Sequence, residues 1–291
     1  MSSAKAKVTA LYRYPIKSMG GEALDHAQLS ELGIPGDRAW AVRDEERGGI
    51  RGGKRFPALM NLQARFAEEP NVEVRSKPAR IEFPDGSSAV STDPDIAERL
   101  SSYLQSPVTL WPLLPADALE HYRRAAPDSA DMEAQLREVF ARTKDEPLPD
   151  LSQFPAELFE YESPPGTYFD AYPLLLMSQH GLDALHQQAS GSDFDVRRFR
   201  PNILIAADAA QPEYLEDQWL GQRLQIGGAQ LQIKLACPRC VMTTHGFAEL
   251  PKDPTIMRTL VREHDGNLGI YAAVTQPGEV KVGDTVSVLE S

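Results

Sequence analysis

Two cysteines, Cys237 and Cys240, are the side chains of this sequence best suited to chemistry at a metal or a redox centre. They are the only cysteines in 291 residues, and they lie two residues apart between two apolar runs. A structural zinc knuckle needs four ligands, and no second pair of cysteines exists. A thioredoxin-type pair requires a helix start, whereas Val241-Met-Thr-Thr244 predicts a strand or a turn. Two interpretations remain: one thiolate binds a metal or cofactor and its neighbour does not, or both are free thiols in a reduced core.

Composition narrows the classes of partner. The formal net charge of −12 argues against general binding to nucleic acid or to an acidic membrane surface, because a phosphate backbone favours a basic footprint. No run approaches 18 consecutive apolar residues, and the first seven residues carry no hydrophobic signal core. Two closely spaced cysteines cannot build a disulfide framework, which fits a reducing compartment. We therefore expect a soluble, cytoplasmic protein.

Side chains that suit an anion occur in the first half of the chain. Lys17 and Ser18 fall in a glycine-bearing turn after a predicted strand over 8–16, where an ammonium group, a hydroxyl and backbone N–H groups can hold a phosphate. The alternative is a solvated lysine in a hairpin. Arg38 lies in a predicted strand over 37–43, on the face that also carries Trp40. Such an arginine needs an anionic ligand or a carboxylate partner.

Further anion candidates occur in the second half. Ser178 follows a buried strand predicted over 172–178 and precedes a predicted helix, so it either caps that helix or binds an anion at the helix start. Arg198 and Arg200 share one face of a strand predicted over 195–205, and Arg197 takes the other face. This cluster suggests a bound anion or a set of carboxylate pairs. The basic, glycine-bearing segment 51–57, which contains Lys54, is a weaker candidate and is otherwise a flexible surface loop.

Short strands separated by turn signals dominate the predicted elements. Strands are expected at 61–67, 72–75, 80–84 and 108–112, a helix at 93–104, and one or two surface helices in a linker over 113–166. After the helix over 179–188, a hairpin over 224–235 turns at Gly227-Gly228 and delivers both cysteines, and strands follow at 268–274 and 280–288. This pattern predicts an α+β, mainly β fold with a small barrel in the second half. We divide it into residues 1–125 and 126–291.

Six ordered motifs carry a family resemblance. They are Tyr14-Pro-Ile-Lys-Ser18, Gly36-Asp-Arg38, the run from Tyr172 to Ser178, Arg198-Phe-Arg-Pro-Asn202, Cys237-Pro-Arg-Cys240 with Thr243-Thr244, and Pro277-Gly-Glu-Val-Lys-Val-Gly-Asp284. In this order, over residues 8 to 288, the chain resembles MOSC-domain proteins with an N-terminal β-barrel domain. That group includes mitochondrial amidoxime reducing components and bacterial reductases of N-hydroxylated bases. The resemblance implies a MOSC-type β-barrel, an N-terminal β-rich domain and a few peripheral helices.

The resemblance also implies a molybdenum cofactor between the two domains, with the thiolate of Cys240 as the metal ligand and catalytic group. A soft thiolate suits such a metal. The cofactor-binding residues carried over from the motifs are Lys17, Ser18, Arg38, Lys54, Ser178, Arg198, Arg200, Asn202, Arg239 and Cys240. Pyridoxal phosphate binding is a second association of this domain family.

The implied activity is reduction of a small N-hydroxylated compound, an N–OH or N-oxide, by a monomer. No ferredoxin-like domain follows, so the electrons are expected from a separate iron–sulfur or flavin protein. Lys54 stands where many relatives have arginine, and His245-Gly-Phe247 replaces their usual Val-Asp-Pro, which leaves the substrate open. Two alternatives remain: a cofactor carrier or sulfur-transfer protein with a persulfide on Cys240, and a barrel that has lost the metal.

Overall fold

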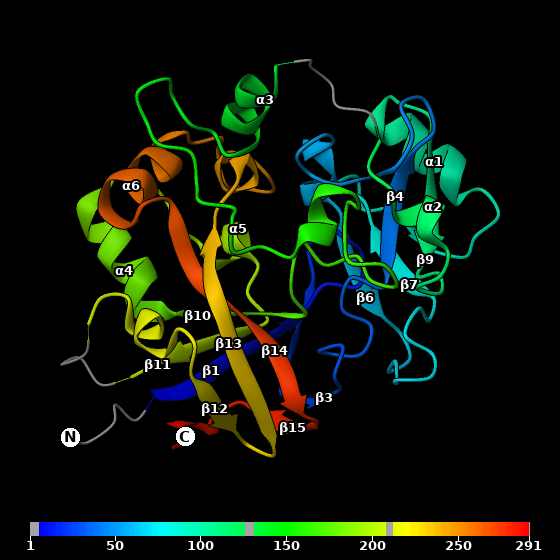
Figure 1. Cartoon of the computed structure of the whole chain (residues 1–291). Coiled ribbons are helices and arrows are strands. Elements are labelled where there is room, and N and C mark those ends of the chain that lie inside the picture. The colour runs from blue at the N-terminus through cyan, green and yellow to red at the C-terminus, as the bar shows by residue number, and fades with distance from the viewer. Residues whose placement is uncertain (1–5, 126–130, 208–211, 291) are drawn as a thin grey trace.

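The computed structural model describes residues 6–125, 131–207 and 212–290, and most of its second half forms a closed β-barrel (Figure 1). The seven barrel strands are β1 (Ala6–Arg13), β10 (Leu174–Ser178), β11 (Ile203–Ala206), β12 (Arg223–Ile226), β13 (Ala229–Pro238), β14 (Asn267–Gln276) and β16 (Thr285–Val288). Their hydrogen-bonded order is β11-β10-β14-β13-β12-β16-β1, and β1 pairs with β11 to close the ring. A short strand, β2 (Glu22–Leu24), extends the sheet beside β1.

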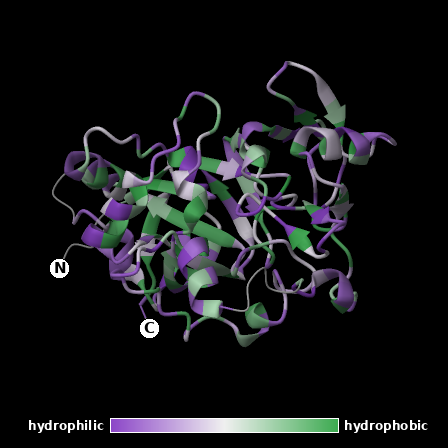
Figure 2. Cartoon of the chain, turned by 90° about the horizontal axis from the view of Figure 1, so that it is seen from above, coloured by the Kyte–Doolittle hydropathy of each residue, from purple (hydrophilic) through white to green (hydrophobic). Residues whose placement is uncertain are grey.

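Alternating apolar residues fill the barrel interior. In β13, for example, Leu231 and Ile233 are buried in the main hydrophobic cluster, while Gln232 between them is only half-buried. The predicted hairpin is confirmed, because β12 and β13 pair up to Ile226 and Ala229 across the Gly227-Gly228 turn. Figure 2 shows the hydrophobic strands at the centre of the barrel and hydrophilic residues on its outer elements. The strand that delivers the cysteines is therefore anchored in the core.

The first half of the chain forms smaller sheets beside the barrel. They contain β4 (Trp40–Asp44), β5 (Ile50–Arg51) and β9 (Val108–Pro112) in one sheet, β6 (Gln63–Phe66), β7 (Ala79–Glu82) and β8 (Ser88–Val90) in a second, and β3 (His26–Leu29) with β15 (Gly278–Lys281) in a third. Helix α1 (Ile96–Leu104) packs against β9. A second hydrophobic cluster, which includes Trp40, Ile81 and Leu100, forms the core of this part.

The strand predicted at 72–75 is wrong. Val72 and Val74 are exposed, and the backbone N–H of Val74 donates to the Asn71 side chain at 2.7 Å. This local turn gives the segment a hydrogen bond that competes with strand pairing, as asparagine side chains often do.

The helices lie at the periphery. The α-helices besides α1 are α2 (Leu119–Tyr122), α3 (Met132–Val139), α4 (Gln179–Gln188), α5 (Val196–Phe199) and α6 (Thr255–His264), and the 3-10 helices are η1 (Pro57–Asn61), η2 (Ala156–Phe159), η3 (Leu215–Trp219) and η4 (Val241–Thr244). Helices α4 and α6 pack together over the outer face of β10 and β11 (Figure 1). Within the described ranges, no helix is long and apolar enough to cross a membrane.

The predicted fold class, mainly β within an α+β architecture, is confirmed. The predicted boundary between residues 125 and 126 borders residues 126–130, which lie outside the described residues, and it stays a prediction. Strand β1 pairs with β11 and β16, so the first strand of the chain belongs to the barrel of the second half. This pairing brings the Lys17 turn, just after β1, to the junction of the two halves.

Candidate active site

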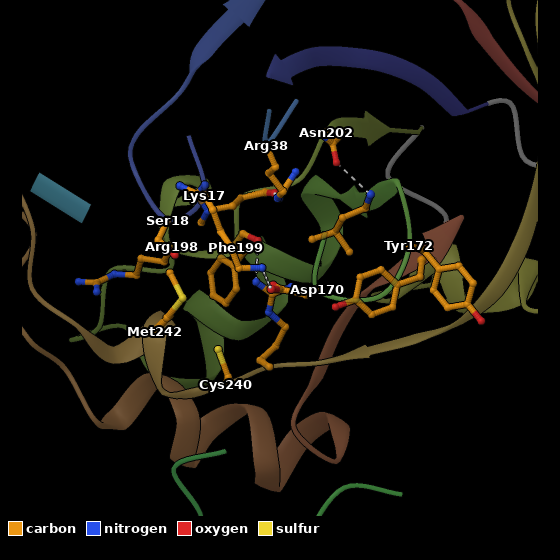
Figure 3. Close-up of a pocket in the computed structure, with 14 residues that line it drawn as sticks. Lys17, Ser18, Arg38, Asp170, Tyr172, Arg198, Phe199, Asn202, Cys240 and Met242 are labelled. Atoms are coloured by element: carbon orange, nitrogen blue, oxygen red, sulfur yellow. Dashed lines mark hydrogen bonds and ion pairs between the residues drawn. The ribbon is translucent and has the colours of Figure 1, made fainter. Parts of the chain in front are cut away.

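The Cys237–Cys240 segment presents its two thiols to different surroundings. Cys237 lies near the end of β13 and its side chain faces the core, with 2% of it exposed. Its sulfur accepts a hydrogen bond from Arg239 Nη1 at 3.0 Å. Burial raises the pKa of the Cys237 thiol despite the nearby guanidinium. Cys240 is half-buried and lines a pocket at the junction of the two halves (Figure 3). The structure therefore distinguishes two thiols that the spacing could not.

Residues 241–244 form the single 3-10 turn of η4, and the strand considered for them does not form. Cys240 is the residue before this turn, and its carbonyl accepts hydrogen bonds from Thr243 N at 3.1 Å and Thr243 Oγ1 at 3.0 Å. These bonds fix the backbone that carries the Cys240 thiol. One turn of four residues has only a small helix dipole, so Cys240 does not stand at the start of a true helix.

Arg38 and Arg200 face the same aromatic ring but do not lie on strand faces, so both strand placements are wrong. Their φ angles are 48° and 58°, a left-handed backbone that a strand cannot contain. Arg38 precedes β4, and Arg200 ends α5, whose helical turn replaces the strand predicted over 195–205. The guanidinium carbons lie 5.1 Å and 4.2 Å from the Tyr14 ring centroid. The left-handed turns place both cations at one site from positions 162 residues apart.

Two arginines that line this pocket each have one buried guanidinium nitrogen without a hydrogen-bond partner among the described residues: Nη2 of Arg200 and Nε of Arg239. Arg200 donates through Nη1 to the Met19 carbonyl, and Arg239 donates through Nη2 to the Phe199 carbonyl at 2.6 Å. Burial, with the nearby charge of Arg38, lowers the pKa of Arg200 to about 10. Buried charged donors are normally satisfied. This pair of donors therefore suits the binding of an anion.

Lys17 is already saturated. Its Nζ donates to Asp170 Oδ1 and the Tyr168 carbonyl, both at 2.8 Å, and more weakly to Ser163 Oγ at 3.4 Å. The Asp170 side chain is 58% exposed and lines the pocket. Partial desolvation by the surrounding residues would raise the pKa of Asp170, but the charges of Lys17 and Lys54 outweigh it and hold that pKa far below its usual range. An anion can reach Lys17 only in competition with this carboxylate.

The glycine-bearing loop before Lys54 contacts the pocket directly. Ser18 Oγ accepts a hydrogen bond from Gly53 N at 2.8 Å, and a Cβ atom at Gly52 would lie 2.5 Å from that oxygen. Lys54 itself is exposed and is not among the residues that line the cavity. Desolvation lowers the pKa of Lys54, whereas the charges at Cys240 and Asp170 raise it, and the net direction is upward. The loop thus brings a protonated amine toward the Cys240 side of the pocket.

Three of the predicted anion ligands have their polar atoms engaged elsewhere. Ser178 is fully buried, does not line the pocket, and accepts the Gly181 N–H at 3.2 Å, which is the capping role. Asn202 accepts from Leu175 N at 3.2 Å and donates to the Tyr12 carbonyl at 3.3 Å. Although both Asn202 and Arg198 border the pocket, neither directs a free polar group into it.

Arg198 instead holds the cysteine segment in place. Its guanidinium donates to four backbone carbonyls, of Asp193 at 3.0 Å, Thr243 at 3.3 Å, His245 at 2.8 Å and Pro251 at 2.8 Å. Two of these acceptors lie within five residues of Cys240. Figure 3 shows the Arg198 side chain directed away from the centre of the pocket.

Sequence reasoning missed several residues that border the pocket. They are Asp170, Tyr172, Leu175, Phe199, Met242 and Tyr271. Asp170 falls at the end of a proline-rich linker, where nothing in the sequence distinguishes it from a surface carboxylate. Its place just before a buried strand was the one available signal. The cavity measures about 60 Å³, several times the minimum that holds one water molecule, so a phosphate-sized group fits.

Comparisons with known proteins agree with the motifs. Mitochondrial amidoxime reducing component 2 of Bos taurus is 25% identical over 96% of this chain and 82% of the relative. Mitochondrial amidoxime-reducing component 1 of Mus musculus is 26% identical over 97% and 82%. Among solved structures, the YUAD protein from Bacillus subtilis aligns over 98% of this chain and 95% of that one, with a TM-score of 0.44 and 14% identity. Residues 5–104 match the MOSC N-terminal beta barrel domain and residues 164–287 match the MOSC domain, so the chain belongs to the family that joins these two domains.

Proposed function

We propose that this chain is an oxidoreductase that reduces N-hydroxylated bases with a molybdenum cofactor bound through Cys240. One observation carries the proposal: Cys240 lines the same cavity as Arg200 and Arg239, and each arginine has one buried guanidinium nitrogen without a partner among the described residues. A thiolate suits a soft metal, and guanidinium groups suit a phosphate. Relatives named amidoxime reducing components support the substrate class.

The residues present fit such a group. The cavity admits a phosphate, for which Arg200 Nη2 and Arg239 Nε are free donors. In the part of the chain that the structure describes, no set of three His, Cys, Asp or Glu side chains could hold a metal ion alone. A metal at Cys240 would therefore need ligands other than a cluster of His, Cys, Asp or Glu side chains. A cofactor that supplies its own metal ligands meets this requirement.

When bound, a molybdenum cofactor supplies the two-electron chemistry that removes oxygen from the substrate. Overall, the N–O bond breaks, two electrons and two protons are consumed, and the products are the N–H base and water. The chain would contribute binding and orientation. Lys54, whose pKa is raised partly by the charge at Cys240, lies on that side and would offer a charged hydrogen-bond donor there. The electrons would come from a separate iron–sulfur or flavin protein.

The test is metal analysis of the purified protein from a molybdenum-replete host, with two serine variants as a matched pair. We expect Cys240→Ser to lower the molybdenum content at least tenfold, because a hydroxyl is a poor substitute for a soft thiolate. Cys237→Ser should retain most of it, since Cys237 faces Arg239 and not the cavity. Circular dichroism checks that both variants fold.

Activity is then measured with benzamidoxime and a dithionite-reduced dye. Equal loss of molybdenum in both variants, or in neither, would contradict the assignment of Cys240. A wild-type protein without molybdenum would overturn the proposal. In that case, a persulfide on Cys240, detected by mass spectrometry, would favour the sulfur-transfer alternative.

A further inference from the structure

A second cavity, of about 370 Å³, lies against the end of β13 that delivers the cysteines. One wall is the linker segment 147–154, and the other is the outer side of β13 at Leu235 and Pro238. Its volume falls within the range of small-molecule sites in proteins. The first pocket is smaller, at about 60 Å³, and under the proposed function the cofactor takes it.

The two cavities share a wall of aromatic side chains. Phe154 lines the second cavity and packs edge-on against Tyr271, with ring centroids 6.3 Å apart. Tyr271 lines the first pocket, and its strand position pairs with Leu235, which lines the second. A molecule in the second cavity would therefore lie one side chain away from the Cys240 pocket.

The lining indicates which class of molecule fits. Leu148, Phe154 and Leu235 offer apolar contacts, and the exposed carboxylates Asp150 and Asp265 add negative charge. Neither carboxylate forms an ion pair in the described ranges. Arg142 interacts electrostatically with Asp265, but its hydrogen bond, at 3.1 Å, goes to the Asp265 backbone carbonyl and not to the carboxylate.

We infer that this cavity binds the apolar body of an aromatic amidoxime and, more tightly, of the cationic amidine formed from it, with Phe154 as the movable partition between it and the Cys240 pocket. The inference rests on the proposed function, because it gives the cavity to the substrate and product of that reaction. Phe154 lies on a segment without regular secondary structure, so rotation of its side chain disturbs no helix or strand. The cavity then selects flat, extended bases over small ones.

The first experiment measures binding of 4-phenylbenzamidine by titration calorimetry. This amidine has no N–O bond to reduce, so binding does not depend on molybdenum or on activity. Ala236→Trp on β13 and Leu148→Trp on the linker fill the cavity from opposite walls. Each should weaken binding at least tenfold. Lys234→Trp, an exposed site on β13 outside both cavities, is the control and should leave the affinity unchanged.

Asp150→Asn should weaken binding two- to fivefold, a small effect because solvent screens an exposed carboxylate. No measurable binding to the wild type, or equal affinity in the wild type and both filled variants, would overturn the inference. A second readout is steady-state reduction: the filled variants should raise KM for 4-phenylbenzamidoxime and not for acetamidoxime. Binding without any turnover would instead contradict the proposed function and leave the cavity assignment standing.

Discussion

Replacing Arg200 by methionine should remove a phosphate-dependent stabilisation of the protein. Phosphate is the probe because Arg200 Nη2 and Arg239 Nε are buried donors without partners in one cavity. Two hydrogen bonds from charged donors contribute about 3–6 kcal/mol, which corresponds to a Kd of roughly 40 µM to 6 mM. For a Kd of about 1 mM, 10 mM phosphate stabilises the folded state by about 1.4 kcal/mol. With an unfolding entropy of about 0.6 kcal/mol/K for this length, the Tm should rise by about 2 °C.

The variant should fold without phosphate, because the energetic effects of the substitution nearly cancel. The pKa of Arg200, lowered from 12.5 to about 10, corresponds to a cost of about 3 kcal/mol for the buried charge. A base with a lowered folded pKa destabilises the protein in full below that pKa, so the whole cost applies at pH 7.5. In Arg200→Met this cost is removed. Its removal offsets the loss of the hydrogen bond to Met19 and of the contact with Tyr14, which together contribute about 2–4 kcal/mol.

The assay is differential scanning fluorimetry at pH 7.5, with chloride matching the ionic strength of each phosphate sample. Loss of one donor should reduce the shift at 10 mM phosphate to below about 1 °C, since affinity falls tenfold or more. Arg197→Met is the control: Arg197 lies on the same short helix but is exposed and paired with Asp195 and Glu249. It should respond like the wild type. An equal response in Arg200→Met and the wild type would refute the anion site.

Three further outcomes are expected. Asp170→Asn should tighten phosphate binding severalfold by calorimetry, because the carboxylate competes for the pocket cations; unchanged or weaker binding would contradict this. His264 pairs with Asp217 at 2.6 Å. Burial lowers the pKa of His264, but the ion pair outweighs burial, so the net pKa is raised. The pair therefore stabilises the folded state fully below about pH 6.5, and this stabilisation is lost as the pH rises through the pKa of the folded state. The Tm difference between wild type and His264→Gln, equivalent to about 1 kcal/mol at pH 5.5, should therefore shrink by pH 8.5, and a constant difference would argue against the pair. Gly52→Ala should lower molybdenum retention, because the added Cβ would lie 2.5 Å from Ser18 Oγ in the pocket. Gly191→Ala is the control, since its Cβ would meet no atom within 4 Å. Equal retention in both variants would show that the position of the loop is unimportant.

The elements that position the site were largely predictable from the sequence. The hairpin that ends in the cysteine segment follows from apolar alternation around Gly227-Gly228, and the helix after Ser178 follows from its cap and spacing. Both depend on local patterns of side chains and turn residues, which the sequence carries directly. The motifs also brought together Lys17, Arg38 and Cys240, which line one pocket.

The local backbone at the site was not predictable from period-two alternation. Arg38 and Arg200 read as strand residues, but their left-handed φ angles turn the chain at the end of an element. Such conformations are costly for side chains other than glycine and persist where surrounding contacts hold them. Asp170 was missed for a different reason, because its role depends on Lys17, 153 residues away. Nothing in the sequence near Asp170 encodes that partner.

The pocket is positively charged although the whole chain is negatively charged. This contrast bears on how tightly the substrate and the product are bound. The chain carries a net charge of −12. In and around the pocket, however, the cationic side chains outnumber the carboxylates among the described residues: the cations are Lys17, Lys54, Arg38, Arg200 and Arg239, and the carboxylates are Asp37, Glu162 and Asp170. An amidoxime is a weak base and is neutral near pH 7, whereas its amidine product is a strong base and is cationic. Under the proposed function, a positive pocket would therefore accept the neutral amidoxime more readily than the charged amidine. Asp150 and Asp265, in the second cavity, lie where the departing cation would be attracted.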